Sequence, residues 1–208
     1  MNELERRLSG GPAAPGEHGT DRLDQDRLQA ALRARAEHEG LLDVAVASLD
    51  SPLGELLVAV TPRGLVRLAY ADETPDAVLA ELSERISPRV LRAPERTDAV
   101  RRELEGYFAG ERRSFATPVD WSLVRGFAVG VLRATARVPF GSVTTYRDVA
   151  AAAGSPRAAR AAGNALGSNP IPIVVPCHRV VHAGGGLGGY TGGLERKRRL
   201  LALEGALR

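Results

Sequence analysis

The sequence TTYRDVAAAAGSPRAARAAGNALG at residues 144–167 predicts two short helices that meet at a glycine. Thr144 is suited to cap the first helix, and Gly154 is suited to end it. Ser155 at the N-cap, followed by Pro156 at the first helical position, predicts the start of the second helix. Two short helices joined in this way are typical of a helix-turn-helix.

The second of these helices has a surface suited to DNA. Its packing side consists mostly of Ala and Gly, which lets the backbone come close to a partner. Arg157 and Arg160 are three residues apart, so they share a face of the predicted helix. An ordinary solvated helix fits the two arginines equally well. The small side chains favour contact with a duplex, because bulky ones would hold the backbone away from a groove.

Charge is distributed unevenly along the 208 residues. The net charge is +3, but residues 1–40 carry −2, residues 41–120 carry −4 and residues 121–208 carry +9. The positive excess suggests a surface that meets a polyanion, with nucleic acid as the first candidate, although charge alone fits a solvated basic face just as well. The basic residues 196–199 of the last predicted helix are expected to face solvent or DNA phosphates.

The region before the helix-turn-helix predicts a small α+β domain. Short apolar runs separated by turn signals predict an antiparallel meander with strands over Val44–Leu49, Glu55–Val60 and Gly64–Tyr70. Helices are predicted over Pro75–Ile86, over Thr97–Phe108 with Thr97 as N-cap, and over Leu123–Arg137. We therefore expect an N-terminal extension (1–40), an α/β domain (41–120) and a C-terminal domain (121–208). The extension combines a flexible Gly/Pro-rich segment at 9–20 with a thin amphipathic helix at Asp21–Glu39.

Composition excludes several classes of protein. With 44% hydrophobic and 25% charged residues, the chain has the composition of a soluble globular protein. It lacks the roughly 18–20 consecutive apolar residues of a membrane helix, and its N-terminus lacks the apolar stretch of a signal peptide. We therefore expect a cytoplasmic protein. The single cysteine, Cys177, excludes a disulfide framework and a cysteine-rich zinc site.

The most informative segment, SNPIPIVVPCHRVVHAGGGLGGYTGG, follows at residues 168–193. Its three prolines cannot lie inside a helix, so Ile171–Val175 is predicted to be a buried, extended strand that leads to Cys177. A lone cysteine is more often an inert core residue than a nucleophile. Here His178 is a neighbouring base that could act through a water or a bend, and Glu204, one of three acids after residue 120, could orient it.

The glycine run after Cys177 predicts a loop that can approach a ligand. Gly184, Gly186 and Gly189 match GxGxxG, but no βαβ unit surrounds them, so we reject a dinucleotide site. Tyr190 and Thr191 are expected to be exposed at the end of this loop. His178 and His182 lie in predicted extended chain, where a spacing of four does not form a metal pair, so no metal is expected.

Pro176-Cys177-His178-Arg179-Val180 resembles the active-site signature of the O6-alkylguanine-DNA alkyltransferases. VPFGSVTTYRDVA before it, and GGYTGG and LLALEG after it, extend the resemblance over about residues 138–205. Residues 43–137 are similar to the N-terminal domain of that family in pattern only, and the first 40 residues have no counterpart. The resemblance implies a ribonuclease H-like N-terminal domain followed by a winged helix-turn-helix domain.

The resemblance also implies a role for each matched residue. Cys177 is the alkyl acceptor, His178 draws the thiol proton through water, and Glu204 stands behind His178. The hydroxyl of Tyr146 acts on the leaving guanine, and its ring presses against the DNA backbone. The other matches are Asn169, which braces the helix-turn-helix against the active-site strand; Arg160, which enters the base stack, with Arg157 as a further DNA contact; Val180 and Tyr190, which line the base pocket; and Thr191, whose backbone N–H faces guanine O6.

The implied activity is that of a methylated-DNA–protein-cysteine S-methyltransferase. It acts once per molecule on O6-alkylguanine, and also on O4-alkylthymine, after the base is flipped out through the minor groove of double-stranded DNA. No cofactor, metal, membrane or obligate protein partner is expected, and the protein is expected to be a monomer. The alternative is a winged-helix protein that binds lesions without transfer, and the presence of Cys177 argues against it. A sensor-regulator would need more cysteines, and a Cys–His hydrolase would need an oxyanion hole.

Overall fold

The computed structural model describes residues 27–28, 31, 35, 40 and 42–207. Residues 42–207 belong to one compact unit. The extension predicted over residues 1–40, with its flexible segment and its helix, lies almost entirely outside the described residues. Within the part of the chain that is described, no helix is long and apolar enough to cross a membrane.

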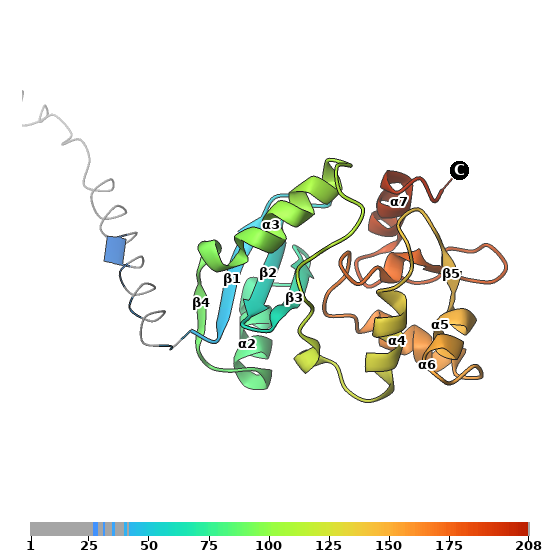
Figure 1. The fold of residues 1–208 in the computed structure, drawn as a ribbon, viewed down its shortest axis with the longest axis horizontal. Helices are drawn as coiled ribbons and strands as arrows, with labels where there is room; N and C mark the ends of the chain where they lie inside the picture. The colour runs from blue at the N-terminus through green and yellow to red at the C-terminus, as the bar shows by residue number, and fades with distance from the viewer. Residues whose placement is uncertain (1–26, 29–30, 32–34, 36–39, 41, 208) are drawn as a thin grey trace, which may run out of the picture. The chain divides into compact units, whose positions relative to one another are not determined.

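A four-stranded sheet forms the first part of this unit (Figure 1). Strands β1 (Val44–Leu49), β2 (Leu56–Thr61) and β3 (Gly64–Tyr70) pair antiparallel in sequence order, which confirms the predicted meander. A fourth strand, β4 (Val90–Arg92), pairs parallel to β1 and was not predicted. Its three residues are too few to show an alternating pattern. The strand order is β3-β2-β1-β4.

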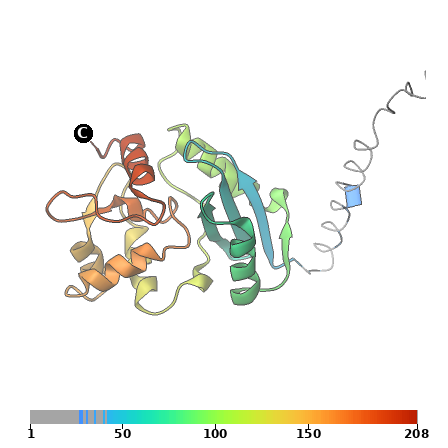
Figure 2. The same cartoon turned by 180° about the vertical axis from the view of Figure 1, so that it is seen from behind.

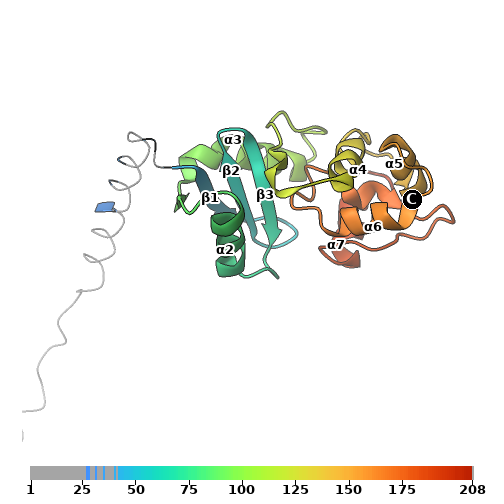
Figure 3. The same cartoon turned by 90° about the horizontal axis from the view of Figure 1, so that it is seen from below.

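Helices α2 (Pro75–Arg85) and α3 (Pro94–Phe108) cover opposite faces of the sheet (Figures 1 and 3). The side chains of β1 alternate between the two faces: Val44 and Val46 pack in the cluster of α2, whereas Ala45 and Ala47 pack in the cluster of α3. The predicted N-cap of α3 was wrong. The helix begins three residues before Thr97, because Pro94 starts it and the Thr97 hydroxyl donates to the Pro94 carbonyl at 2.8 Å.

The second part of the unit is mainly helical. A short 3₁₀ helix, η2 (Trp121–Leu123), is followed by α4 (Phe127–Thr135), which is shorter than predicted, and then by α5 (Tyr146–Ala152), α6 (Ala159–Gly167) and α7 (Leu194–Leu203). Helices α4, α5 and α6 pack against one another, and Figure 2 shows them from behind. The structure therefore confirms an α+β protein with a helical C-terminal part.

Two further helix boundaries, both in the helix-turn-helix, differ from the prediction. The cap of α5 is Thr145 rather than Thr144: its side chain accepts from the Asp148 backbone N–H at 3.2 Å, and the two residues form a capping box. Helix α6 begins at Ala159, because residues 155–158 form a turn closed by the Ala158 N–H and the Ser155 carbonyl at 2.9 Å. Arg157 therefore lies in this turn and does not share a helix face with Arg160.

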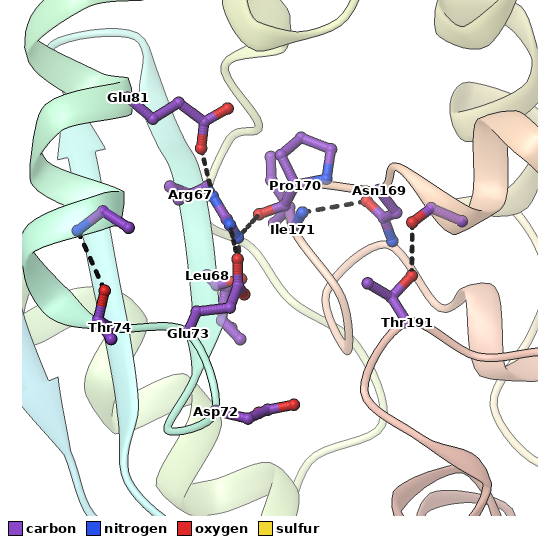
Figure 4. Close-up of polar contacts among 12 residues, drawn as sticks. Arg67, Leu68, Asp72, Glu73, Thr74, Glu81, Asn169, Pro170, Ile171 and Thr191 are labelled. Carbon is purple, nitrogen blue, oxygen red and sulfur yellow. Dashed lines mark hydrogen bonds and ion pairs between the residues drawn. The ribbon is translucent and has the colours of Figure 1, made fainter.

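The segment Ile171–Val175 is buried as predicted, but it is a turn and not an extended strand. The Val175 N–H donates back to the Ile171 carbonyl at 2.9 Å, and Ile173 has a φ of 73°. The residue just before the segment, Pro170, is bonded to the sheet. Leu68 of β3 donates its N–H to the Pro170 carbonyl at 2.9 Å. Figure 4 shows Arg67 of β3 between Glu81 and the same carbonyl.

Candidate active site

Cys177 begins the 3₁₀ helix η3 (Cys177–Arg179), directly after Pro176. The side chain of Cys177 is buried, with a relative exposure of 4%. The Asn169 side chain approaches its sulfur, with Nδ2 and Sγ 3.1 Å apart. Beyond η3, strand β6 (Val180–Val181) pairs parallel to β5 (Thr144–Thr145), so the segment that carries the thiol is joined to the start of the helix-turn-helix.

Asn169 holds the turn that leads to Cys177. Its Nδ2 donates to the Val175 carbonyl at 2.8 Å, and its Oδ1 accepts from the Ile171 N–H at 3.0 Å (Figure 4). One amide side chain therefore closes the two ends of the turn and also contacts the thiol. The resemblance implies that Asn169 braces the helix-turn-helix against an active-site strand; in the structure, its side chain holds the turn over residues 171–175.

His178, which follows Cys177 in the sequence, and Glu204 have fully buried side chains. The two atoms His178 Nε2 and Glu204 Oε1 are 2.9 Å apart, although the residues are separated by 26 positions. Glu204 caps the C-terminal end of α7. Its Oε1 also accepts from the Tyr107 hydroxyl at 2.7 Å, and Arg179 donates to both of its oxygens at 2.8 Å.

The electrostatics fix which groups carry protons. Burial opposes ionisation of Glu204, but the hydrogen bonds from His178 and Arg179 outweigh it and lower the pKa of Glu204 to about 2. Burial lowers the pKa of His178 as well, against the opposing effect of Glu204. At neutral pH a neutral imidazole therefore faces an ionised carboxylate. Because the carboxylate has no hydrogen to donate, Nε2 carries the hydrogen, which leaves Nδ1 as the acceptor.

His178 Nδ1 is buried and has no hydrogen-bond partner among the described residues. A buried nitrogen with a free lone pair, next in sequence to a cysteine, can receive a proton. The thiol itself needs such a base. Burial raises the pKa of Cys177 to about 11, although Asn169 and the charge of Lys197 oppose the rise. Cys177 is therefore a thiol, not a thiolate, at neutral pH in the folded protein.

Lys197 is fully buried near the Cys177 thiol, on which its charge acts. This is contrary to the prediction that the basic residues of the last helix face solvent or phosphates. Its Nζ donates to the Val180 carbonyl at 2.6 Å and to the Gly189 carbonyl at 3.2 Å. Burial lowers the pKa of Lys197 to about 8. Lys197 thus joins the glycine loop to the strand after Cys177.

A pocket of about 610 Å³ opens at Cys177. It is lined by Tyr146, Ala159, Arg160, Gly163, Asn164, Leu166, Gly167, Cys177, His182, Gly189, Tyr190 and Thr191. The lining combines α6 of the helix-turn-helix with the loop that follows Cys177. The structure therefore brings Cys177 together with four of the other predicted residues: Tyr146, Arg160, Tyr190 and Thr191.

Tyr146 shapes one wall of the pocket. A Cβ atom built on Gly188 would lie 2.4 Å from the Tyr146 hydroxyl, so only a glycine lets the loop pass. The Tyr146 hydroxyl forms a hydrogen bond with the Gly189 backbone. Burial raises the pKa of Tyr146, so its hydroxyl keeps its proton at neutral pH. The ring of His182 packs against the ring of Tyr146, with the two centroids 5.2 Å apart.

Three predicted site residues lie differently from the expectation. Val180 is fully buried and is not among the residues that line this pocket. Arg157 is exposed in the turn before α6 and does not line the pocket either. Tyr190 is half-buried rather than exposed, because its hydroxyl meets that of Tyr70 at 2.6 Å. Thr191 is exposed as expected, and its hydroxyl donates to the Gly167 carbonyl (Figure 4).

Sequence reasoning missed four residues around the site: Tyr70, Tyr107, Arg179 and Lys197. Tyr107 lies within a helix that the sequence predicted, but no pattern indicated its partner. Arg179 had a signal, since it adjoins His178 in the motif. In the described part of the chain, no group of three or more His, Cys, Asp or Glu side chains could hold a metal ion.

Two family models match this chain. The DNA binding domain of 6-O-methylguanine DNA methyltransferase matches residues 126–206, and the ribonuclease-like domain of the same enzyme matches residues 44–121. Together the two matches cover most of the chain and both parts of the described unit.

Individual relatives agree with the family models. The methylated-DNA–protein-cysteine methyltransferase of Mycolicibacterium paratuberculosis is 43% identical over 159 residues, which cover 76% of this chain and 90% of the relative. The constitutive enzyme of Bacillus subtilis is 36% identical over 156 residues, covering 74% of this chain and 92% of that protein.

Solved structures share the fold. The Mycobacterium tuberculosis O6-methylguanine methyltransferase has a TM-score of 0.67 at 36% identity, covering 79% of this chain and 94% of that one. The M. tuberculosis OGT in complex with DNA has a TM-score of 0.66 with the same identity and coverage. From its two domain matches, its relatives and its fold, this chain belongs to the methylated-DNA–protein-cysteine methyltransferase family.

Proposed function

We propose that this protein repairs double-stranded DNA by transferring the alkyl group from guanine O6 to the sulfur of its own Cys177. The observation that carries the proposal is the position of Cys177: it lines a pocket together with residues of the helix-turn-helix, and the next residue, His178, is paired with Glu204. Membership of the family supports the reaction type. The DNA-bound M. tuberculosis relative supports DNA as the partner.

The first step is removal of the thiol proton. A thiol whose pKa is about 11 is a weak nucleophile at neutral pH, so the proton must leave as the sulfur attacks. We assign His178 Nδ1 as the acceptor, through a bridging water. Glu204 then stabilises the imidazolium that forms, because it stays ionised and holds Nε2 at 2.9 Å.

The transfer itself is a single displacement. Sγ of Cys177 forms a bond to the alkyl carbon while the bond from that carbon to O6 breaks, and the electron pair of the broken bond stays on the guanine. The Tyr146 hydroxyl donates a hydrogen bond to the guanine ring and stabilises this charge. The thiol proton ends on the guanine, so the products are an unmodified base and a thioether on Cys177. The thioether is stable, so each molecule reacts once.

The lesion must leave the base stack to reach Cys177. Extrusion of a base costs a few kcal/mol, and least for a poorly paired one. Arg160 is exposed at the pocket and can fill the gap in the duplex, while the Ala and Gly residues of α6 let the backbone approach the minor groove. We extend the proposal to O4-alkylthymine, which also carries its alkyl group on an oxygen attached to the base ring. A monomer suffices, because the described residues of one chain supply the whole pocket.

The test is the mass of the peptide that holds Cys177 after incubation with a duplex containing one O6-methylguanine. We expect a gain of one methyl group at that residue and a yield that stops at one methyl per protein. The variant C177A should bind the duplex with unchanged affinity and transfer nothing. If folded wild-type protein binds the lesion and its Cys177 peptide stays unmodified, the protein is a lesion-binding module instead. Equal loss of binding and transfer in C177A would indicate a structural cysteine.

A further inference from the structure

Tyr70, the last residue of strand β3, reaches from the sheet to the wall of the acceptor pocket. Its side chain is buried, and its hydroxyl lies 2.6 Å from the hydroxyl of Tyr190. The two rings meet edge to face with their centroids 6.3 Å apart. Tyr190 lines the pocket, and its ring also packs nearly perpendicular to the ring of His178, with the centroids 6.3 Å apart. Tyr70 therefore contacts a residue that forms part of the pocket wall.

The surroundings of Tyr70 fix its own ring. The Arg196 guanidinium stacks over it at 4.4 Å from the centroid, and Arg196 also bonds to Asp72 at 2.7 Å and to the Gly192 carbonyl at 3.0 Å. A Cβ atom on Gly192 would lie 2.5 Å from the Tyr70 ring and 3.0 Å from the Tyr190 ring. Only a glycine lets the loop pass this close, so the loop packs directly against the ring of Tyr70.

The hydroxyl pair adds a directional hydrogen bond to the ring contacts that Tyr190 makes with Tyr70 and His178. Tyr70 also lines a second pocket of about 360 Å³, which shares Gly167 and Thr191 with the acceptor pocket. There is thus open volume beside the tyrosine pair, into which a less constrained ring could move. Burial raises the pKa of both tyrosines, so the pair stays neutral and hydrogen-bonded at physiological pH.

We propose that Tyr70 is a positioning residue that holds Tyr190 in place as a wall for the alkylated base, so that strand β3 sets how tightly the pocket binds its substrate. This inference rests on the proposed function. We expect the effect on binding, because the polar contacts of Cys177 with Asn169 and of His178 with Glu204 do not include Tyr70.

The experiment measures the rate at which free O6-benzylguanine modifies Cys177, as a function of its concentration, in the full-length protein. Free base reports on the pocket without the affinity for DNA. Y70F removes only the hydroxyl, and we expect its half-saturating concentration to rise about three- to tenfold, the range for one hydrogen bond, with an unchanged limiting rate constant. Y190F should give a similar rise. The double variant Y70F/Y190F should lose no more than either single variant, because both remove the same bond.

Y107F is the matched control, since it also removes one buried tyrosine hydroxyl that bridges the sheet part and the C-terminal part. Its partner is Glu204, so it should lower the limiting rate constant and leave the half-saturating concentration unchanged. An unchanged half-saturating concentration in Y70F, a fall in its limiting rate constant instead, or additive losses in the double variant would each overturn the role of Tyr70. Wild-type protein that reacts with neither free base nor methylated duplex would contradict the proposed function itself.

Discussion

The two sides of the acceptor pocket are built in opposite ways. On the inner side, Cys177, His178 and Glu204 are at most 5% exposed, and Glu204 accepts hydrogen bonds from three different side chains. On the outer side, α6 and the loop after Cys177 present Arg160, several glycines and the exposed Thr191. The inner side combines residues from distant parts of the chain, whereas the outer side is formed by local stretches of small residues.

This difference separates the chemistry from recognition. Proton transfer needs donors and acceptors fixed to within a fraction of an ångström, and burial together with the hydrogen bonds of Glu204 achieves this. Contact with a flipped base and a duplex needs close backbone approach, and small residues at an exposed surface allow it. Substitutions on the inner side should therefore alter the rate of transfer and the stability together, while substitutions on the outer side should alter access to the pocket or the position of the Tyr146 hydroxyl.

The largest effect is expected for E204Q. The amide keeps the shape of Glu204 but removes its charge, so it cannot stabilise an imidazolium, and Arg179 loses its ionised partner. We expect the rate of transfer to fall on the order of 10³-fold and the free energy of unfolding to fall by about 3 kcal/mol. Single-turnover kinetics and urea unfolding measure the two. A variant that keeps the wild-type rate would show that Glu204 has only a structural role.

The same pair predicts how stability depends on pH. The pKa of Glu204 is lowered to about 2 in the folded protein from its ordinary 4.5, so its stabilising effect is complete above pH 4.5 and is lost as the pH falls towards 2. The difference in unfolding free energy between wild type and E204Q should therefore shrink by about 1.4 kcal/mol per pH unit below pH 4.5. Urea unfolding at a series of pH values tests this, and a difference that does not change with pH would contradict the assignment.

The sequence predicted the outer side better than the inner one. The helix-turn-helix and its arginine follow from local signals, namely glycine, capping residues and the Ala/Gly pattern. The contacts of Tyr107 with Glu204 and of Tyr70 with Tyr190 join residues 97 and 120 positions apart. No local pattern reports such pairs. Glu204 itself was a weak candidate until the resemblance to a family identified it.

The errors in the fold have the same origin. Three prolines exclude a helix between residues 170 and 176, but they do not choose between a strand and a turn. That choice depends on the bond from Leu68 to Pro170 and on the Asn169 side chain, which are tertiary contacts. The Ser155-Pro156 start signal was likewise too early, because the chain makes one further turn before α6.

On the outer side, G188A should have the next largest effect on transfer. Gly188 has a φ of 69°, and a Cβ there would lie 2.4 Å from the Tyr146 hydroxyl, so this hydroxyl must move from the guanine site. We expect transfer to fall on the order of 10²-fold, as when one donor to a developing charge is lost. G184A is the matched control, because Gly184 lies in the same loop with nothing within 4 Å of a Cβ atom. Equal activity of the two variants would contradict the role given to Tyr146.

The smallest effect is expected for R160A, and it tests access without chemistry. Arg160 lines the pocket, whereas the equally exposed Arg157 does not, so R157A changes the charge by the same amount away from the site. Both variants should weaken binding to undamaged duplex similarly, since each removes one positive charge. Only R160A should slow transfer from a methylated duplex, by about tenfold, because part of the extrusion cost is no longer offset. Neither variant should slow reaction with free O6-benzylguanine, which needs no extrusion. If R160A lowers the rate of transfer equally from free O6-benzylguanine and from the methylated duplex, Arg160 acts on the pocket itself. The distinction between the inner and outer sides would then not hold at this residue.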